Sequence, residues 1–397
     1  MEQPRVELSI SVIRDLIGFD HLQSAWNELV AHEGPLAVFR TFAWQRAWWR
    51  HHGGERQLRI VVVRDEKTVI AIFPLYLERE ALPFGQAAKV LRFVGFGADT
   101  APDYLDAIQS AEYSEAAARC FLEAVHAMKD WDALCLNDLS RESSLLASIQ
   151  ECTQTATWRS VVRPSAQIAF AELPSTYEEF LQSLSRDLRY VIRSGRKQFQ
   201  LLPNARFVIS SRDRLERDIG ALARLHRSRF APNTVGIAFA SPEFNEFHRE
   251  VMQEYLQRGW LRLCLLEVDG EPIAAHYYYS FKGTWFHFQS GIDLRFAKLS
   301  PGTLLTSFAI EAAIQEGARE LDMLRGEYQH KDRWATGHRQ TFDTLAWRHT
   351  LPGFAWSLRW HRMPSIKTRL KRLMTTFGWE RLDGSRQPPP ELPASTA

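Results

Sequence analysis

The stretch Gln289–Trp334, QSGIDLRFAKLSPGTLLTSFAIEAAIQEGARELDMLRGEYQHKDRW, decides the fold. Its pattern predicts the end of a strand, a loop, a helix over 303–316, a strand over 320–324 and a polar turn. Ser300-Pro301-Gly302 is a helix start signal. The polar residues of the helix fall four apart on one narrow stripe, which predicts a helix that is mostly buried against a sheet.

The first turn of this helix is a candidate anion site. Free backbone N–H groups and the positive end of the helix dipole face the preceding loop, which is a general seat for phosphate. Glycine at position 302 lets a ligand approach the backbone closely. The alternative is that Gly302 only starts a helix, as a glycine does in many α/β proteins that bind nothing there.

Length and composition describe a soluble globular protein. The 397 residues suffice for two domains, and 45% apolar with 24% charged residues is an ordinary balance. The net charge of +2 gives no global field for nucleic acid or membrane. The scattered cysteines form no CxxC or Cys/His cluster, so we expect neither disulfides nor a metal site. No secretion signal or membrane-spanning stretch is seen, so we expect a cytoplasmic protein.

The elements follow in the same order in both halves: strand, two helices, hairpin, strand, helix, strand. This order predicts an internal repeat of an α/β unit, in which a mixed twisted sheet is flanked by helices. Two further expectations concern the middle of the chain. Residues 157–173 read as strand pieces broken at Pro164, and 177–199 reads as one helix with a basic side.

Differences between the halves locate the expected site in the second half. The first half carries Tyr113-Ser114-Glu115, with no glycine, where the second has Ser300-Pro301-Gly302. After the last matched strand the first half has Asp138-Leu139-Ser140, whereas the second has Arg325-Gly326-Glu327-Tyr328. The first half therefore reads as a degenerate copy that supports the second.

Two groups of residues resemble the GNAT acyltransferase superfamily, and within it the CelD-like (cellulose-biosynthesis) group, which is related to the FemABX aminoacyl transferases. One is Phe42-Ala43-Trp44 with Ala47-Trp48-Trp49, followed by Ile72-Phe73-Pro74-Leu75. The other runs from Ser290-Gly291 through Ser300-Pro301-Gly302 to Gly326-Glu327-Tyr328 and Trp334. The resemblance covers roughly 20–350 and implies tandem GNAT-like domains and acetyl-CoA or another acyl-CoA as donor.

In such proteins the pyrophosphate of the donor sits at the N-terminus of the helix after the fourth strand. The family's glycine-rich signature is reduced here to Gly302, with two cations nearby. The candidate donor-binding residues are Arg295, Lys298, Ser300, Gly302, Thr303 and Leu304.

Acyl transfer to an amine or hydroxyl needs a base, a donor to the oxyanion and an acid for the leaving thiolate. Polar residues gather at the end of the last central strand, where ligands of open α/β sheets bind. The chemistry favours Asp322 or Glu327 as the base, Tyr328 as the acid and Lys331 as the group that orients the acceptor. The alternative is that these side chains form ordinary ion pairs within the turn.

His276, Tyr278 and Arg186 are the candidate acceptor-binding residues. His276 and Tyr278 lie in an aromatic strand, and a core position is the alternative for both. Arg186 begins the basic stripe Arg186, Arg189, Arg193, Arg196 and Lys197, most of which shares one helical face. The stripe reads either as a solvated surface or as a binding surface for an anionic acceptor or tRNA.

The expected organisation is a degenerate GNAT-like domain at 1–173, an acyltransferase domain at 174–352, a basic amphipathic helix at 353–382 and a disordered tail at 383–397. Residues 355–374 combine tryptophans with cations and no acid, which favours contact with the inner face of a membrane or packing on the protein itself. The leading hypothesis is an acyl-CoA-dependent N- or O-acyltransferase acting on a small amine, a sugar or a polysaccharide precursor. The alternatives are an aminoacyl-tRNA-dependent transferase and a non-catalytic scaffold of a polysaccharide-export system; free nucleic acid is not an expected partner.

Overall fold

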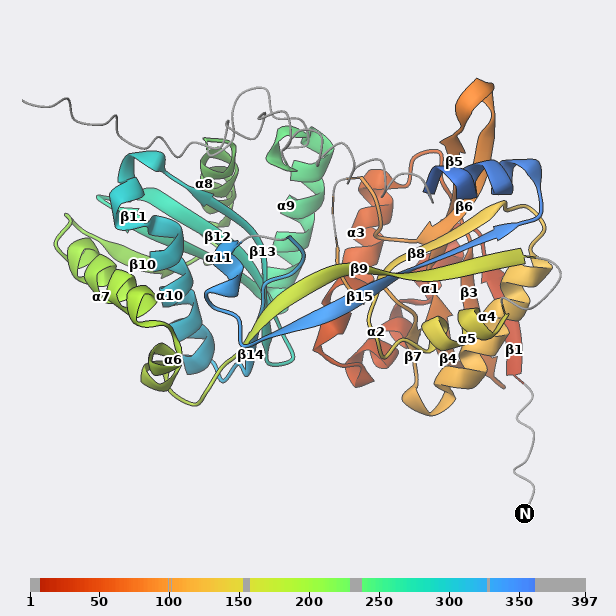
Figure 1. Ribbon diagram of the computed structural model, residues 1–397, viewed down its shortest axis with the longest axis horizontal. Coiled ribbons are helices and arrows are strands. Elements are labelled where there is room, and N and C mark those ends of the chain that lie inside the picture. Colours follow the sequence, from red (N-terminus) through yellow and green to blue (C-terminus); the bar gives the residue numbers. More distant parts are fainter. Residues whose placement is uncertain are drawn as a thin grey trace, which may run out of the picture.

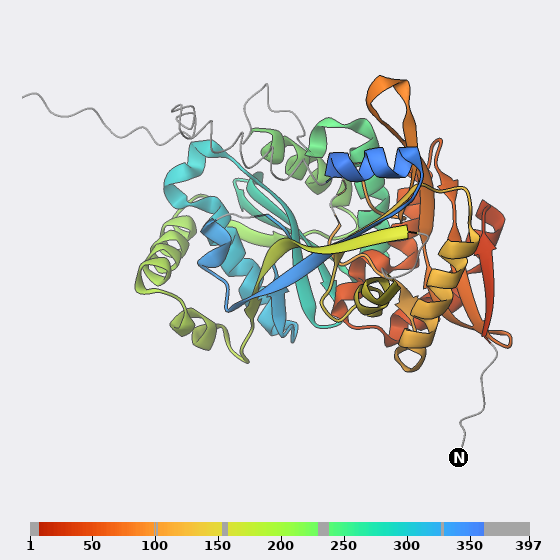
Figure 2. The ribbon, with the colours of Figure 1, turned by 45° about the vertical axis from the view of Figure 1, so that its right-hand side comes forward.

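The computed structural model describes residues 8–360 except 99, 101, 153–157, 229–237, 327 and 328. Two lobes lie side by side, and two long strands run from one to the other (Figures 1 and 2). The elements of the N-terminal lobe are β1 (Leu8–Ile13), α1 (Leu16–His21), α2 (Gln23–His32), η1 (Pro35–Arg40), α3 (Phe42–His52), β2 (Gln57–Leu58), β3 (Ile60–Asp65), β4 (Thr68–Phe73), β5 (Leu75–Ala81), η2 (Pro83–Gly85), β6 (Ala87–Phe93), β7 (Ile108–Gln109), η3 (Ala111–Tyr113), α4 (Ser114–Ala127), β8 (Ala133–Leu139) and α5 (Ser144–Cys152).

The second half of the chain builds the other lobe and returns to the first. Its elements are β9 (Trp158–Glu172), α6 (Tyr177–Ser183), α7 (Arg186–Gln200), β10 (Arg206–Ile209), α8 (Leu215–Ser228), η4 (Ala238–Ala240), α9 (Pro242–Gln257), β11 (Leu261–Val268), β12 (Glu271–Phe281), β13 (Thr284–Ile292), η5 (Leu294–Leu299), α10 (Pro301–Gln315), β14 (Glu320–Asp322), α11 (Gln329–Asp332) and β15 (Gly337–Arg348). Residues 351–360 form a further helix.

The two lobes share an order of strands and helices, although in the first lobe β1, β3, β4 and β7 form a separate sheet of four strands. In the first, β1, β3 and β4 are antiparallel neighbours, and α4 crosses between the parallel strands β6 and β8. In the second, β10, β11, β12 and β13 are antiparallel, and α10 crosses between the parallel strands β13 and β14. The prediction of two related mixed α/β halves is therefore confirmed.

The strands β9 and β15 join the lobes into one sheet of eleven strands, in the order β10-β11-β12-β13-β14-β9-β15-β8-β6-β5-β2. One end of β9 pairs with β14, and β15 pairs with both β9 and β8. The expected boundary at 173 thus falls just after a strand that belongs to both lobes.

Two local predictions were wrong. Trp158–Glu172 is the single strand β9, because Pro164 lies opposite a register shift between Gln340 and Phe342 where the ladder is already irregular. The helix expected over 177–199 is two helices, because Ser185 has an extended backbone and its side chain accepts a hydrogen bond from the N–H of Leu188 at the start of α7.

The core of the second lobe lies on both faces of its sheet. On one face, α10 packs with α6 and α7 over alternate residues of the strands, including Tyr278, Trp285 and Leu321. On the other face, α8 and α9 pack over Tyr277, Tyr279 and Phe286, and this core continues into the N-terminal lobe.

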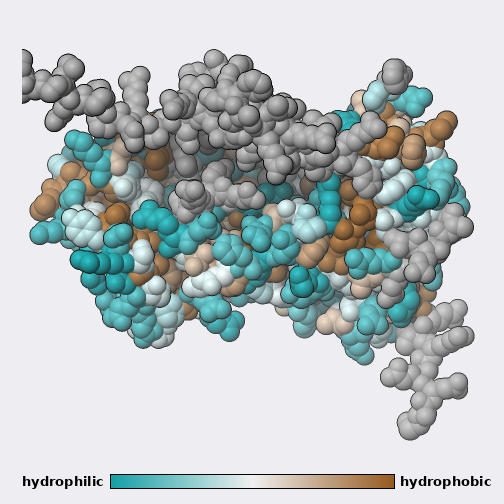
Figure 3. All heavy atoms as spheres, in the orientation of Figure 1, coloured by the Kyte–Doolittle hydropathy of each residue, from teal (hydrophilic) through white to brown (hydrophobic). Residues whose placement is uncertain are grey.

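The molecular face in Figure 3 mixes hydrophilic and hydrophobic residues without one dominant patch. None of the described helices is long and apolar enough to cross a membrane.

Candidate functional site

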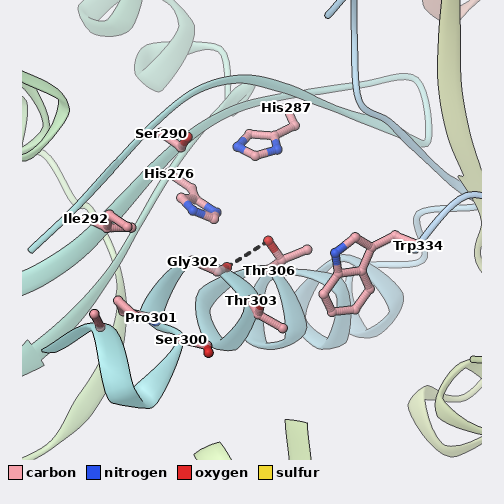
Figure 4. A pocket seen from close by; sticks show the side chains of 11 residues that line it. His276, His287, Ser290, Ile292, Ser300, Pro301, Gly302, Thr303, Thr306 and Trp334 are labelled. Atoms are coloured by element: carbon pink, nitrogen blue, oxygen red, sulfur yellow. Dashed lines mark hydrogen bonds between the residues drawn. The ribbon is translucent and has the colours of Figure 1, made fainter. Parts of the chain in front are cut away.

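A cavity of about 290 Å³ lies between β12, β13 and the first turns of α10. Its wall consists of His276, His287, Ser290, Ile292, Ala297, Ser300, Pro301, Gly302, Thr303, Thr306 and Trp334. Figure 4 shows the two imidazoles, from neighbouring strands, over the first turns of the helix, with Trp334 on one side. We call this space the helix-start cavity.

The cavity exists because two parallel strands separate. β13 pairs with β14 only from Thr284–Glu320 to Phe286–Asp322. Beyond Phe286, β13 continues to Ile292, whereas β14 ends at Asp322. His287 is therefore the first residue of β13 without a partner in β14, and the cavity begins at that point.

The first turn of α10 presents two backbone donors. Leu304 is the first residue whose N–H closes a bond within the helix, to the carbonyl of Ser300 at 3.0 Å. Pro301 has no N–H, so the free donors of the first turn are the N–H groups of Gly302 and Thr303. Ser300 has a left-handed backbone (φ 50°) and its side chain does not cap the helix. Gly302 and Thr303 both line the cavity.

Gly302 leaves space where a ligand would lie. A Cβ built on this residue would meet only Cγ2 of Ile292, at 3.6 Å, which is an ordinary contact. The protein itself therefore does not require glycine at 302, and the space beside the backbone remains open on the cavity side. These features fit the phosphates of a nucleotide-linked donor.

Three of the predicted donor-binding residues lie elsewhere. Arg295 is bound to Asp293 by its guanidinium (2.6 Å) and lines a different cavity, of about 370 Å³, with Arg224 and Glu271. Lys298 is exposed and does not line the helix-start cavity. Leu304 is buried in the core beneath α10. Ser300, Gly302 and Thr303 do line the cavity, as predicted.

Of the predicted acceptor residues, only His276 reaches this cavity. His276 is buried, and its Nδ1 lies 3.0 Å from the hydroxyl of Tyr278. Tyr278 itself belongs to the core, where burial raises the pKa of its hydroxyl. His287 was not among the predicted site residues, although its ring centroid lies 4.7 Å from that of His276. The sequence feature that could have identified His287 is that it is a second histidine in the aromatic strands, on the same face as His276.

Most arginines of the basic stripe of α7 bind other groups of the same chain. Arg186 is exposed in the first turn of α7 and lines none of the cavities described here. Arg189 donates to the carbonyl of Gln182 at 2.9 Å, and Arg193 pairs with Glu178 at 3.2 Å. Arg196 is bound to α10. The stripe is thus no continuous row of cations available to an anionic partner.

Asp322, one candidate base, is buried at the end of β14 on the face opposite the helix-start cavity. Its Oδ2 accepts hydrogen bonds from Tyr104 (2.8 Å) and Arg339 (3.1 Å), and its Oδ1 accepts one from the N–H of Leu324 (2.8 Å). Burial raises the pKa of this carboxyl to about 7, although all three donors oppose the shift. The alternative of an ion pair within the turn does not hold for Asp322, whose cationic partner is Arg339, while Arg325 of the turn is bound to Asp103.

Lys331 holds the turn after β14. Its Nζ donates to the carbonyls of Met323 (2.8 Å), Leu324 (3.0 Å) and Arg325 (2.7 Å), and burial lowers its pKa to about 8. In this arrangement the amine fixes the backbone rather than pointing into the helix-start cavity. Glu327 and Tyr328 lie outside the described residues, so their roles stay predictions.

A second cavity, of about 210 Å³, lies on the face to which Asp322 points. Both lobes line it: Tyr104, Ser140, Arg141 and Glu142 come from the first, and His338, Arg339 and Gln340 from β15. We call it the interlobe cavity. Beside it, the guanidinium of Arg325 is bound to Asp103 (2.6 Å) and to Asp138. The described residues include no group of three or more side chains that could hold a metal ion.

The chain has a mixed α/β fold with helices on its sheets, and the helix start between two parting parallel strands is similar to the arrangement in GNAT domains. Residues 186–332 match the family described as acetyltransferase (GNAT) domain. Among solved structures, FemX is similar with a TM-score of 0.58 at 10% identity, over 87% of this chain and 99% of that one. A conserved protein of unknown function from Bacteroides thetaiotaomicron is similar with a TM-score of 0.53 at 10% identity, over 86% and 100%. The search of curated protein sequences found no match.

Proposed function

We propose that the protein is an acyltransferase that takes its acyl group from an acyl-CoA and passes it to an amine or hydroxyl. The observation that carries the proposal is the helix-start cavity. It lies where β13 leaves β14 and ends on the free N–H groups of Gly302 and Thr303. A fifteen-residue helix adds a positive dipole end to these donors.

When bound, acyl-CoA would supply the reactive thioester. The N–H groups of Gly302 and Thr303 would hold its phosphates. The hydroxyl of Thr306 would not donate to the phosphates, because it already donates to the carbonyl of Gly302 at 3.0 Å. The walls that His276, His287 and Trp334 provide would keep water from the remainder of the donor. The family match within this same segment supports the choice of donor.

We further propose that the acceptor enters from the interlobe cavity. Asp322 is the last residue of β14 that pairs with β13, and His287 is the first residue of β13 beyond that pairing, so the donor and acceptor sides meet where the strands part. A carboxyl with a pKa of about 7 can accept a proton near neutral pH. Asp322 is therefore our choice for the base among the described carboxylates, with Tyr104 and Arg339 positioning it.

Titration with acetyl-CoA tests the donor. We expect thermal stabilisation of the wild type, by about 2.7 kcal/mol when the ligand is a hundredfold above its Kd. Gly302→Ala should fold as stably without ligand, because its Cβ would meet only Ile292, but should bind acetyl-CoA at least about tenfold more weakly, a change of about 1.4 kcal/mol.

Gly220→Ala is the matched control. Gly220 lies exposed in α8, and a Cβ there would meet nothing within 4 Å, so acetyl-CoA binding should not change. No stabilisation of the wild type at millimolar acetyl-CoA would contradict the proposal. Equal binding by the wild type and Gly302→Ala would place the donor elsewhere.

A further inference from the structure

The helix at 351–360 presents a second apolar face to solvent. Only eight large hydrophobic side chains are exposed in the described part of the chain, and three of them belong to this helix. Leu351 is 82% exposed, Phe354 58% and Leu358 39%. Their spacing of three and four residues places them on one side of the helix. A cluster of this kind, unlike scattered single residues, indicates an interaction site.

The opposite side of the same helix is packed on the N-terminal lobe. Trp356 is fully buried and donates to Glu80 Oε2 at 2.9 Å, and the ring of Trp360 lies tilted against that of Trp356 with ring centroids 5.5 Å apart. Figure 1 shows the helix (blue) beside β5 and β6. A Cβ on Gly353 would lie 2.8 Å from the carbonyl oxygen of Asp132, so the helix is pressed close to the lobe. Packing on the lobe therefore accounts for the tryptophans but not for the three exposed side chains.

Cations surround the exposed side chains. A groove of about 530 Å³ runs beside the helix, and Arg159, Arg348 and His349 line it together with Leu351, Phe354 and Leu358. Arg159 is exposed and lines the groove, and no ion pair joins it to a described carboxylate. Arg348 donates to the carbonyl of Lys129 (2.8 Å) and Arg359 to the carbonyl of Ala81 (2.7 Å), so both keep their positive charge without a carboxylate partner. The nearby carboxylate of Asp132 is occupied by the hydroxyl of Thr350 (2.9 Å) and by the N–H of Lys89 (3.0 Å).

The charge of the adjoining sequence has the same sign. Residue 360 is the last described residue, and 37 residues follow it in the sequence. Between 361 and 374 the sequence carries Arg362, Lys367, Arg369, Lys371 and Arg372, with no Asp or Glu. Apolar side chains beside cations whose charge no carboxylate balances are the composition that binds a membrane surface carrying anionic lipids.

We propose that the face formed by Leu351, Phe354, Leu358 and Arg159 docks the protein on an anionic lipid bilayer. The apolar side chains enter the boundary between headgroups and acyl chains, and the cations contact lipid phosphates. The packed side, with Trp356 and Trp360, keeps the helix attached to the N-terminal lobe, so the lobe is carried to the membrane as well. This proposal is independent of the transferase function.

Co-sedimentation of the full chain with vesicles tests the proposal. We expect binding to phosphatidylcholine vesicles that contain phosphatidylglycerol, much weaker binding to phosphatidylcholine alone, and release at high salt. The double variant Leu351→Ser/Phe354→Ser should bind on the order of tenfold more weakly. The matched control is Leu201→Ser, which removes a leucine that is 79% exposed at the end of α7 in the other lobe, and it should bind like the wild type.

A second variant tests the same proposal if the double variant folds poorly. Arg159→Gln changes one exposed side chain and should weaken binding to anionic vesicles while leaving the residual binding to phosphatidylcholine unchanged. Unchanged vesicle binding by both variants would overturn the proposal. So would a wild type that ignores vesicles but forms dimers dissolved by Leu351→Ser/Phe354→Ser, because the face would then join two copies of the chain.

Discussion

The hydroxyl of Tyr104 in the N-terminal lobe donates a hydrogen bond of 2.8 Å to Oδ2 of Asp322 in the other lobe. Both side chains are buried, and Tyr104 has a left-handed backbone with φ of 60°. A bulky residue holds such a conformation only where its surroundings fix it, and this is frequent at functional sites. The bond therefore joins the lobe that we interpret as a support to the carboxyl that we propose as the base.

The pKa of Asp322 predicts how stability depends on pH. Burial raises the pKa from 3.8 to about 7, so the folded state holds a proton that the unfolded state releases near pH 4. The stabilisation from this proton is complete below about pH 4 and is lost as pH rises through about 7. Relative to Asp322→Asn, the wild type should lose at most about 4 kcal/mol over this range, because one pKa unit corresponds to about 1.4 kcal/mol.

Urea unfolding of both proteins at several pH values measures this difference. Tyr104→Phe is the companion variant: it removes one donor but keeps the titrating carboxyl, so its profile should keep the wild-type slope. If wild type and Asp322→Asn instead showed parallel profiles, Asp322 would be ionised throughout and the role of base would pass to another group.

Lys331 should matter for stability more than its place in a turn suggests. Lys331→Met leaves the carbonyls of Met323, Leu324 and Arg325 without their shared donor, and we expect a loss on the order of 3 kcal/mol in the free energy of unfolding. Arg333→Met is the matched control, because Arg333 is exposed two residues later, and its effect should stay within about 0.5 kcal/mol. Chemical denaturation measures both, and equal effects would refute the structural role given to Lys331.

The helix-start cavity could be predicted from the sequence because its signals are local. Ser300, Pro301 and Gly302 lie side by side in the chain, and a helix start exposes its N–H groups wherever it occurs. The two related halves could be predicted for the same reason, since the residues of each strand and helix carry the periodicity of that element. Arg295 and Lys298 are also close to Gly302 in sequence, but a nearby charged side chain can point toward the helix start or away from it. Both residues lie in η5, which directs them away from the helix-start cavity.

The interlobe contacts could not be predicted in this way. Tyr104 and Asp322 are 218 residues apart, and no sequence pattern around either residue predicts contact with the other. The alternative interpretation placed ion pairs within the turn, but Arg325 pairs with Asp103 of the other lobe, because the lobes meet there and bury Asp103 completely. Burial of this kind is set by the packing of the two halves, which periodicity within one half does not contain.

Arg196 tests the reassignment of the basic stripe. Its guanidinium binds Glu311 (2.6 Å) and Ser307 Oγ (2.9 Å) on α10, and it lies 4.1 Å from the ring centroid of Phe308. We expect Arg196→Ala to cost on the order of 2 kcal/mol, because it removes charge-assisted hydrogen bonds and a cation–π contact at once.

The matched control for this prediction is Arg193→Ala. Arg193 is one turn earlier on α7, and both it and Glu178 have side chains that are 60% exposed, so its loss should change stability by less than about 1 kcal/mol. Unfolding by urea compares the two variants. A large effect for Arg193 with a small one for Arg196 would mean that the stripe is not anchored to α10 as described.

Gly291 should be intolerant of any side chain, for a reason unrelated to ligand binding. A Cβ at this position would lie 2.4 Å from the backbone nitrogen of His226 and 2.7 Å from Cβ of Leu225, because α8 crosses β13 there at close range. Since the obstacle is backbone, Gly291→Ala must push α8 away from the sheet, and we expect a loss of about 1–3 kcal/mol. In contrast, Gly220→Ala in the exposed part of the same helix should stabilise the protein by about 0.5–1 kcal/mol, because alanine favours helix and meets no neighbour. Thermal or urea unfolding of the two variants gives opposite signs if α8 packs on β13 as observed, and the same sign would show that it does not.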